Sequence, residues 1–494
     1  MEGNRFAARG DTMQFTFIGL IQLAIGAIIF FSGSLRHAIF FLILSGLFSG
    51  SAAIVLPALG GSSIPPIQFA CLIVYLRILA PRGGFMGLLP EAIRANRWLV
   101  LYSLYGVAMA FIAPRLFAHR IDVAPMRFDD ARNLFDTAPL APTTQNITTS
   151  VYMLGTMAIA IGSYLVCRLR GGVATLITAA IVVGWLHVVL GLATALAVGT
   201  PVDAFFELFR NGSYAQLNQS VGEFVRIRGL FPESSSYADF AFAYFTLNAE
   251  LWYRSIRPRA TGGVALALAA ILLLSTSSTA YIALALYLAF FALRAMALPH
   301  MAEMRRVRQL VLIMLGGVAV SACAFLVVPH LLSTATEIVL HMTLDKSSSD
   351  SGQQRLFWAT QGLTAFKTSL GLGIGPGSFR SSSLLTAILG STGIAGSAAI
   401  LAYLYTVFQP TRHSTFGVSD ELALTIGGSF ATAALLCLIP PSLIAPSADL
   451  GANFALFAGA AVALRQMAGA RSGTMRNAAP AAATDGPLRA QATA

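Results

Sequence analysis

Residues 173–198 read VATLITAAIVVGWLHVVLGLATALAV, an apolar stretch without a charged side chain. As an α-helix this stretch would be about 39 Å long, and the hydrocarbon core of a bilayer is about 30 Å thick. It directly follows CRLRGG at residues 167–172, a short linker with two arginines. The stretch therefore predicts a transmembrane helix that starts at a basic linker.

Similar runs fill most of the 494 residues, which are 56% hydrophobic and 11% charged. Ordinary soluble domains are about 25% charged. This composition excludes a soluble enzyme, a nucleic-acid-binding protein and a disordered scaffold. We predict an all-α polytopic membrane protein with about 12–14 transmembrane helices, from runs near 15–32, 37–57, 65–80, 97–117, 150–167, 173–198, 236–253, 262–276, 278–296, 309–328, 383–408, 422–444 and 452–466.

Arginine placement predicts the orientation of these helices. The linkers 167–172 and 254–259 contain arginines and no acid, which is typical of cytoplasmic loops. The same rule explains the net charge of +11 without nucleic acid as a partner. The long, mixed-charge loops then face the other side, and they span about 118–149, 199–235 and 329–382.

We therefore interpret residues 1–470 as a single polytopic membrane domain and 471–494 as a disordered cytoplasmic tail. The front end does not fit a regular alternation, because 13 spans with a cytoplasmic C-terminus would place Arg5 and Arg9 outside. We expect one early run within 37–80 not to cross the membrane fully, since three prolines interrupt it. The four cysteines have neither metal-ligand nor redox spacing, so we expect no disulfide, metal or cofactor.

The end of the second loop is the most unusual stretch of the chain, RIRGLFPESSSY at residues 226–237. Arg226 and Arg228 precede a Gly-x-x-Pro turn, and Glu233 stands directly before a spanning run. A helix N-terminus favours anions, so these residues fit a phosphate clamp beside a carboxylate that takes a proton. They also fit a helix cap with arginines that reach the membrane interface.

The third loop contains Arg355 and Trp358, followed by GLGIGPGSFR at residues 371–380. Glycines let backbone amides approach an anion or a sugar closely, so Gly373 and Gly375 are candidate binding residues. Trp358 suits a sugar face beside a phosphate, although an interfacial tryptophan is equally ordinary. The run also fits a flexible linker, and it is not a nucleotide-binding P-loop because no Gly-Lys-Ser/Thr follows.

In the first loop, Arg115 follows Pro114 at the end of an apolar run. An arginine at the membrane edge reaches lipid phosphates, and the alternative is a solvated loop with local ion pairs. Acidic residues are nearly absent from the middle of the runs. This argues against a proton- or sodium-coupled transporter, which needs ionisable groups at mid-depth.

Two stretches resemble the O-antigen polymerase and ligase-like superfamily of bacterial polysaccharide assembly. One is Arg228-Gly229-x-Phe231-x-Glu233, and the other is Arg355-x2-Trp358 followed by the glycine run. The distance from Arg355 to Gly371 also matches an R-x15-G pattern of a periplasmic polymerase loop. The resemblance implies a C-type glycosyltransferase-like helical fold with long periplasmic loops in the bacterial inner membrane.

The resemblance further implies a metal-independent glycosyltransferase that uses oligosaccharides carried on undecaprenyl pyrophosphate, with the lipid bilayer and a chain-length regulator as other partners. The expected catalytic residues are Glu233, Arg228 and Arg355. The expected pyrophosphate- and sugar-binding residues are Arg226, Arg380, Arg115, Trp358, Gly373 and Gly375. A purely structural role of Glu233, as a helix cap or as an ion-pair partner of Arg228, is the alternative.

We expect a repeat-unit polymerase. Related ligases carry a histidine after the glycine run, whereas Arg380 is followed here by three serines and no histidine before the next run. An oligosaccharide ligase therefore remains the second hypothesis. A polysaccharide or lipid-linked oligosaccharide flippase is the third, although a charged mid-membrane cavity would be expected for it. The sequence does not select the polymer, its linkage or its stereochemistry.

Overall fold

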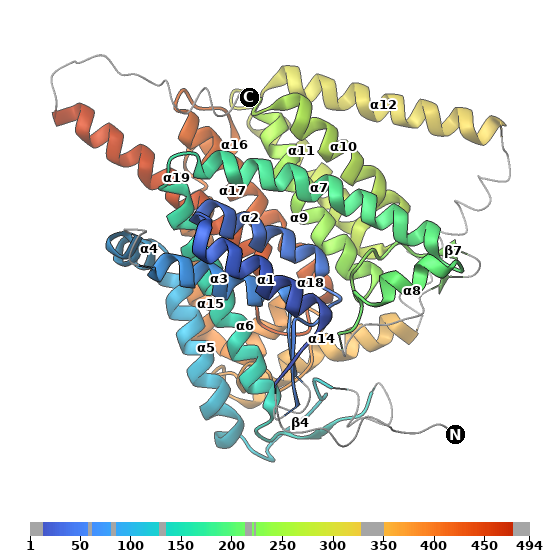
Figure 1. Cartoon of the computed structure of the whole chain (residues 1–494), viewed down its shortest axis with the longest axis vertical. Coiled ribbons are helices and arrows are strands. Elements are labelled where there is room, and N and C mark those ends of the chain that lie inside the picture. Colours follow the sequence, from blue (N-terminus) through green and yellow to red (C-terminus); the bar gives the residue numbers. More distant parts are fainter. Residues whose placement is uncertain are drawn as a thin grey trace.

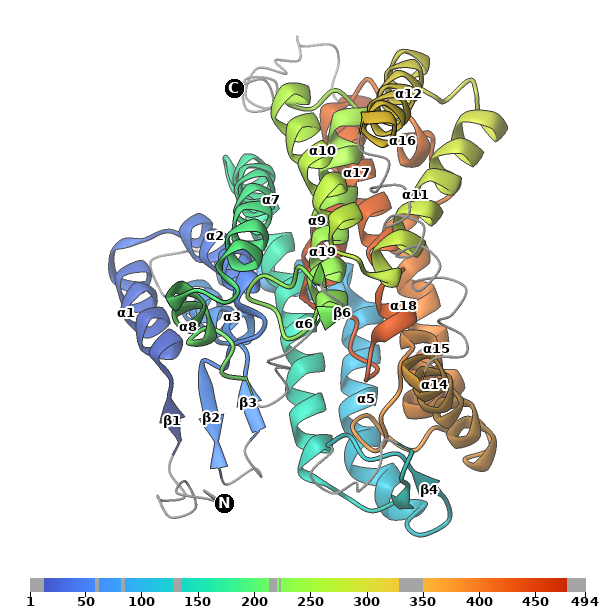
Figure 2. The same ribbon diagram turned by 90° about the vertical axis from the view of Figure 1, so that its right-hand side faces the viewer.

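The computed structural model describes residues 13–57, 62–80, 85–127, 135–212, 220–221, 224–327 and 350–477. Helices dominate the described chain, and the described strands form one three-stranded sheet and two hairpins. Figures 1 and 2 show a bundle of helices with the short strands and α14 (Asp350–Thr368) at one end. The other end carries α12 (Met304–Val327) and α16 (His413–Phe416).

Most of the remaining helices lie in the predicted runs, whereas the short helices α4 (Leu89–Ala95) and α8 (Pro201–Glu207) lie outside them. The others in the first half are α1 (Phe17–Ser32), α2 (Leu35–Ser45), α3 (Pro66–Leu79), α5 (Arg97–Leu116), α6 (Thr144–Cys167) and α7 (Gly172–Ala197). Those in the second half are α9 (Ser234–Tyr253), α10 (Pro258–Leu274), α11 (Ser278–Ala297), α15 (Leu384–Phe408), α17 (Leu422–Leu436), α18 (Pro441–Ile444) and α19 (Ala452–Asn477).

The strands are short and connect neighbouring loops. β1 (Gln14–Phe15), β2 (Ile54–Leu56) and β3 (Ser62–Ile64) form an antiparallel sheet in that order. The two hairpins pair β4 (Asp122–Val123) with β5 (Ala138–Pro139) and β6 (Ser220–Val221) with β7 (Phe224–Val225).

Six described helical segments are long and apolar enough to cross a membrane, so the chain is an all-α polytopic membrane protein as predicted. Four further apolar helices are shorter, which leaves the predicted count of 12–14 unsupported by length alone. The run 309–328 lies in α12, which runs across the end of the bundle in both views. The six segments are Arg97–Leu116, Thr144–Cys167, Gly172–Ala197, Ser278–Ala297, Leu384–Phe408 and Leu422–Ile444.

The predicted helix over 37–57 is wrong. α2 ends at Ser45, where glycines and serines follow, and Ile54–Leu56 form the central strand of the three-stranded sheet. A helix of 11 residues is only about 16 Å long, about half the thickness of the hydrocarbon core. Because Ile54–Leu56 are not helical, their backbone amides and carbonyls form hydrogen bonds with the neighbouring strands instead.

The centre of the bundle is built from α9, α17 and α19. Nearly every residue of α9 is buried, and α17 packs against both α9 and α19. The sequences of α17 and α19 are rich in alanine, glycine and serine, which allow close approach of helix backbones. α19 continues to Asn477, so the predicted tail boundary at 471 is too early, and residues 478–494 lie outside the described ranges.

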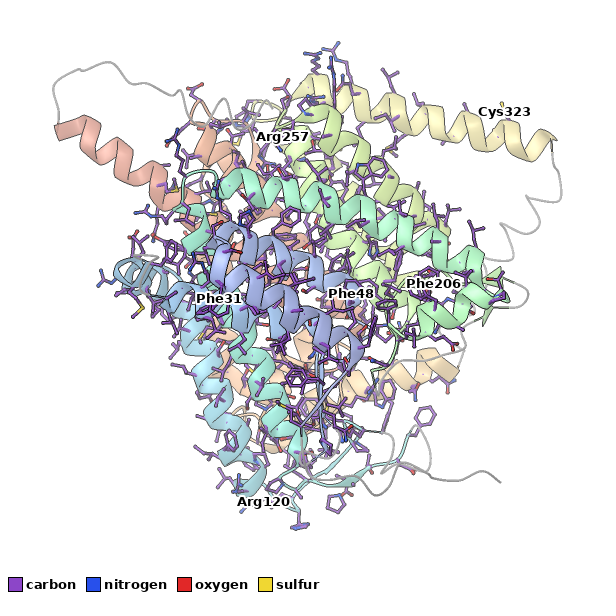
Figure 3. The ribbon with its side chains drawn as sticks, in the orientation of Figure 1. Phe31, Phe48, Arg120, Phe206, Arg257 and Cys323 are labelled. Carbon is purple, nitrogen blue, oxygen red and sulfur yellow. The ribbon has the colours of Figure 1, made fainter. Side chains whose placement is uncertain are left out.

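The basic linker 254–259 and the first predicted long loop lie at opposite ends of the molecule. Figure 3 shows Arg257, from the linker 254–259, at one end and Arg120, from the loop 118–149, at the other. This separation agrees with the predicted alternation of the helices. The third predicted loop also contains α14, a long helix that the sequence analysis did not anticipate.

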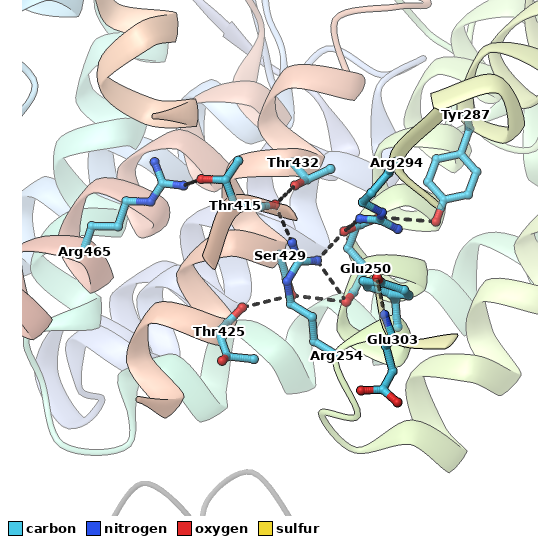
Figure 4. A network of polar contacts seen from close by, with 11 residues as sticks. Glu250, Arg254, Tyr287, Arg294, Glu303, Thr415, Thr425, Ser429, Thr432 and Arg465 are labelled. Atoms are coloured by element: carbon cyan, nitrogen blue, oxygen red, sulfur yellow. Dashed lines mark hydrogen bonds and ion pairs between the residues drawn. The ribbon is translucent and has the colours of Figure 1, made fainter. Parts of the chain in front are cut away.

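A buried ion network lies near the Arg257 end of the bundle (Figure 4). The carboxylate of Glu250 accepts hydrogen bonds from Arg254, from Arg294 at 2.8 Å and from Tyr287 at 3.5 Å. Arg254 also donates to the carbonyl of Thr415 at 2.7 Å, which joins α9 to α16. All three charged side chains are almost completely buried, and their ion pairs offset the free-energy cost of removing these charges from water.

Candidate functional site

The three long loops meet at the end of the bundle that carries α14. The amide of Arg380 donates to the carbonyl of Ala124 at 2.9 Å, which joins the third loop to the first. The side-chain amide of Asn146 at the start of α6 donates to the carbonyl of Pro376 at 2.8 Å. The first and third loops are therefore joined at this end of the bundle, where Figure 2 shows β4 and α14.

Residues 226–233 form a shaped turn that leads into α9. Arg210 is buried, and its guanidinium donates to the carbonyl of Gly229 at 2.9 and 3.1 Å. The amide of Gly50 donates to the carbonyl of Leu230 at 2.8 Å, so the turn is also fixed from the first sheet region. Gly229 has φ +54°, a conformation that suits glycine. These contacts hold Arg226 and Glu233 in place on either side of the turn.

Glu233 precedes the first turn of α9 in an extended conformation. Its carboxylate accepts a hydrogen bond from the hydroxyl of Ser235, and it makes no side-chain cap to the helix backbone. The arginines that interact with it electrostatically are Arg226 and Arg380. The sequence left two structural roles open for Glu233, a helix cap and an ion-pair partner of Arg228. In the described structure its side chain does not cap α9, and Arg228 interacts with Asp203 and Glu207.

Arg226 is the arginine of the motif that faces this carboxylate. Burial lowers the pKa of its guanidinium, Glu233 and Tyr281 oppose the shift, and the positive charge of Arg355 adds to it. Within the part of the chain that the structure describes, the buried Nε of Arg226 has no hydrogen-bond partner. A half-buried guanidinium beside a second arginine, with a spare Nε donor, is suited to bind an anion.

Arg380 comes from the segment after the glycine run. Its guanidinium lies 4.4 Å from the ring centroid of Trp358, a cation–π contact. Burial lowers the pKa of Arg380, and Glu233 opposes the shift. Trp358 is itself buried, so the ring supports Arg380, and this contact occupies the face that we expected to meet a sugar.

Arg355 lies on α14, between the first turn of that helix and Trp358. Its backbone carbonyl accepts a hydrogen bond from the hydroxyl of Ser382, which ties α14 to the segment that carries Arg380. The side chain is half-buried, and its charge reaches Arg226 from the other loop. The second and third predicted loops thus bring Arg226 and Arg380 to the carboxylate of Glu233, and Arg355 lies close enough to act on Arg226.

Arg228 belongs to a different cluster. Burial lowers the pKa of its guanidinium, whereas the carboxylates of Asp203 and Glu207 oppose the shift. Arg210 shares these acids, with Nη1 3.6 Å from the Asp203 carboxylate. Balanced charges of this kind stabilise the turn. The geometry therefore favours Arg226 over Arg228, although the sequence analysis ranked them in the opposite order.

The glycine run packs the loop instead of presenting free amides. Gly371, Gly373, Gly375 and Gly377 all have φ between +80° and +94°, which side chains rarely adopt. The amide of Gly373 donates to the hydroxyl of Ser369 at 2.8 Å, and that of Gly375 donates to the carbonyl of Ser391 at 3.0 Å. The backbone amides of Gly373 and Gly375 thus donate hydrogen bonds to acceptors within the protein. We therefore correct the predicted role of these two glycines from ligand binding to packing of the loop.

Arg115 is exposed on α5, and its guanidinium donates to the carbonyl of Phe111 in the same helix. The structure does not support its predicted membership of the cluster. Tyr281 of α11, which the sequence did not indicate, interacts with Arg226. It does not stand in a recognisable motif, so only the fold identifies it.

Together, Arg226, Arg355, Arg380 and Glu233 give a site with three positive charges and one negative charge. Such a site favours a multiply charged anion, and the carboxylate is available to accept a proton from a neighbouring hydroxyl. No protein-family model matches the chain, and no curated protein matches it in sequence.

Proposed function

We propose that the chain is a glycosyltransferase that polymerises polysaccharide repeat units, moving a growing glycan from undecaprenyl pyrophosphate to the next lipid-linked repeat. The observation that carries the proposal is that Arg226 and Arg380, from two loops, interact with Glu233 while Arg355 adds positive charge beside Arg226, at one end of a bundle of apolar helices. A lipid-linked donor places its diphosphate at the membrane surface, which is where such a site would be needed.

In this reaction the protein has to stabilise negative charge that develops on the diphosphate. The bond between the anomeric carbon of the donor sugar and the diphosphate oxygen breaks, and both electrons remain on the diphosphate. Arginines stabilise this growing charge through bidentate hydrogen bonds. In the proposed mechanism Arg226, Arg355 and Arg380 bind the diphosphate, and Trp358 keeps Arg380 oriented through their 4.4 Å contact.

The acceptor hydroxyl forms the new bond to the anomeric carbon and loses its proton. Glu233 is the proposed general base, since it is the carboxylate that interacts with two of the three arginines. The hydrogen bond from Ser235 orients this carboxylate at the start of α9.

The proposal includes a C-type glycosyltransferase-like arrangement in the bacterial inner membrane, with the arginine site facing the periplasm. The clustered arginines of the linkers, at the opposite end from the site, support this orientation. A chain-length regulator of the export system is the protein partner that we propose.

The test is the size distribution of polysaccharide and lipid-linked intermediates in a deletion strain. The proposal expects single repeat units, on the carrier lipid or on a core acceptor, and no long chains. The wild-type gene should restore long chains, Arg228→Ala should restore them substantially, and Arg226→Ala should not. Long chains that accumulate on the carrier lipid in the deletion strain would instead indicate a ligase. An unchanged distribution would contradict both functions.

A further inference from the structure

A second group of arginines lies at the end of the bundle opposite the candidate site. α15 begins shortly after Arg380 and, with a kink at Gly393, carries the chain toward the other end. There a cavity of about 330 Å³ opens between the end of α15 and α19. Its lining residues are Thr406, Gln409, Arg412, Val462, Arg465 and Gln466.

Arg465 is the central cation of this cavity. It is 3% exposed, and it donates to the carbonyl of Val407, to the carbonyl of Phe408 at 2.9 Å and to the hydroxyl of Thr415 at 2.8 Å. These three acceptors are uncharged. Figure 4 shows Arg465 on the far side of Thr415 from the Glu250 network, so the carboxylate of that network serves Arg254 and Arg294 instead.

The cavity has polar groups that remain unused. Among the residues that the structure describes, the buried Nε of Arg465 and the buried Oε1 of Gln409 have no hydrogen-bond partner. Arg412 adds a second guanidinium to the lining from an exposed position, which gives a ligand access. The lining contains two arginines and no acid.

Burying an arginine without a counterion is unfavourable unless an anion neutralises its charge and accepts its unused hydrogen bonds. The bonds to Val407 and Phe408 show that Arg465 also caps the end of α15. Capping accounts for neither the second arginine nor the open cavity with its spare donor. We propose that this cavity, lined by Arg412 and Arg465, binds a phosphate group. The proposal does not depend on the glycosyltransferase function.

The bound phosphate group has two candidate sources, namely free phosphate and the headgroup of an anionic lipid. The cavity is at the lower end of the size range of ligand pockets, which suits a small group of this kind. The guanidinium fork matches the geometry of phosphate oxygens.

The first arm of the test uses the purified full-length chain in detergent. Its melting temperature is measured against increasing potassium phosphate, with potassium chloride at equal ionic strength as the reference. Phosphate should raise the melting temperature more than chloride does. Arg412→Gln should weaken the apparent affinity about tenfold, since it removes one charged donor. The matched control is Arg259→Gln, an exposed arginine of a basic linker, which should behave as wild type.

The second arm uses nanodiscs of phosphatidylcholine with and without phosphatidylglycerol, and native mass spectrometry counts retained lipids. Retention of phosphatidylglycerol that Arg412→Gln abolishes would identify a headgroup as the source. A phosphate response in detergent without such retention would identify free phosphate. If neither probe binds in preference to its reference, or if Arg412→Gln binds both probes as wild type does, the proposal is wrong and Arg465 only caps α15.

Discussion

The arginine cluster around Glu250 and the arginine cluster near Glu233 differ in burial and in pairing. Arg254 and Arg294 form ion pairs with the carboxylate of Glu250, and all three side chains are shielded from solvent. Near Glu233, by contrast, Arg226, Arg355 and Arg380 are only half-buried, and Arg226 and Arg380 interact with the carboxylate electrostatically. Fully buried ion pairs join helices, whereas half-buried arginines can be reached by a ligand. This difference separates a structural cluster from a candidate site.

The largest expected effect comes from breaking the paired cluster. Glu250→Ala would leave two buried guanidinium groups without a counterion, which costs about 3–5 kcal/mol. We expect the protein to be lost from the membrane fraction or to aggregate in size-exclusion chromatography. Glu303→Ala, at the same end and outside the ion pairs among the described residues, is the control and should leave folding intact. A folded, active Glu250→Ala protein would refute the structural role.

At the other end, Glu233→Gln should leave the fold intact and abolish most activity. Loss of a general base costs about 10²–10⁴-fold in rate. Because the carboxylate caps no backbone amide of α9, the melting temperature should remain close to that of wild type. The measurements are polymer formation in membranes and protein amount by immunoblot. Loss of the protein would instead assign Glu233 to stability.

The prediction that most sharpens the comparison concerns the two arginines of the motif. Arg226→Ala should reduce polymer formation about 10²–10³-fold, since it removes a donor to the developing charge. Arg228→Ala is the matched control, because Arg228 shares the acids Asp203 and Glu207 with Arg210. It should reduce activity less than Arg226→Ala does. The reverse order would restore the ranking that the sequence alone favoured.

The smallest effect is expected for Trp358→Leu. The contact of Arg380 with the indole ring is worth about 0.5–2 kcal/mol, so activity should fall by about 2- to 30-fold. Leucine keeps much of the buried apolar volume, and the amount of protein should not change. Steady-state rates at saturating and limiting donor would show the change. An effect as large as that of Arg226→Ala would mean that Trp358 contacts the sugar directly.

The membrane class of the fold was predictable because hydropathy is a local property of each segment. The run 173–198 lies almost entirely within the single helix α7. The run 37–57 misled the prediction, because hydropathy alone does not distinguish a buried strand such as Ile54–Leu56 from part of a helix. The helix α14 was missed for a related reason, since its polar sequence resembles a loop.

The candidate site was predictable in part. Glu233, Arg226, Arg355 and Arg380 were all named from the sequence, since each stands near a recognisable turn or glycine run. The choice between Arg226 and Arg228 was not, because residues two apart form equally plausible candidates until Arg210 and its acids are placed. Tyr281 reaches the site only through tertiary packing.

The most direct test of the contrast is binding of a soluble diphosphate lipid, farnesyl diphosphate, to the purified chain. The titration uses the Arg412→Gln background, so that the cavity at the opposite end does not contribute. Our account predicts saturable binding that Arg226→Ala weakens at least about tenfold, as expected for loss of a charged hydrogen bond. Equal affinity with Arg226 and with alanine at that position would contradict the claim that the surplus arginines form a diphosphate site.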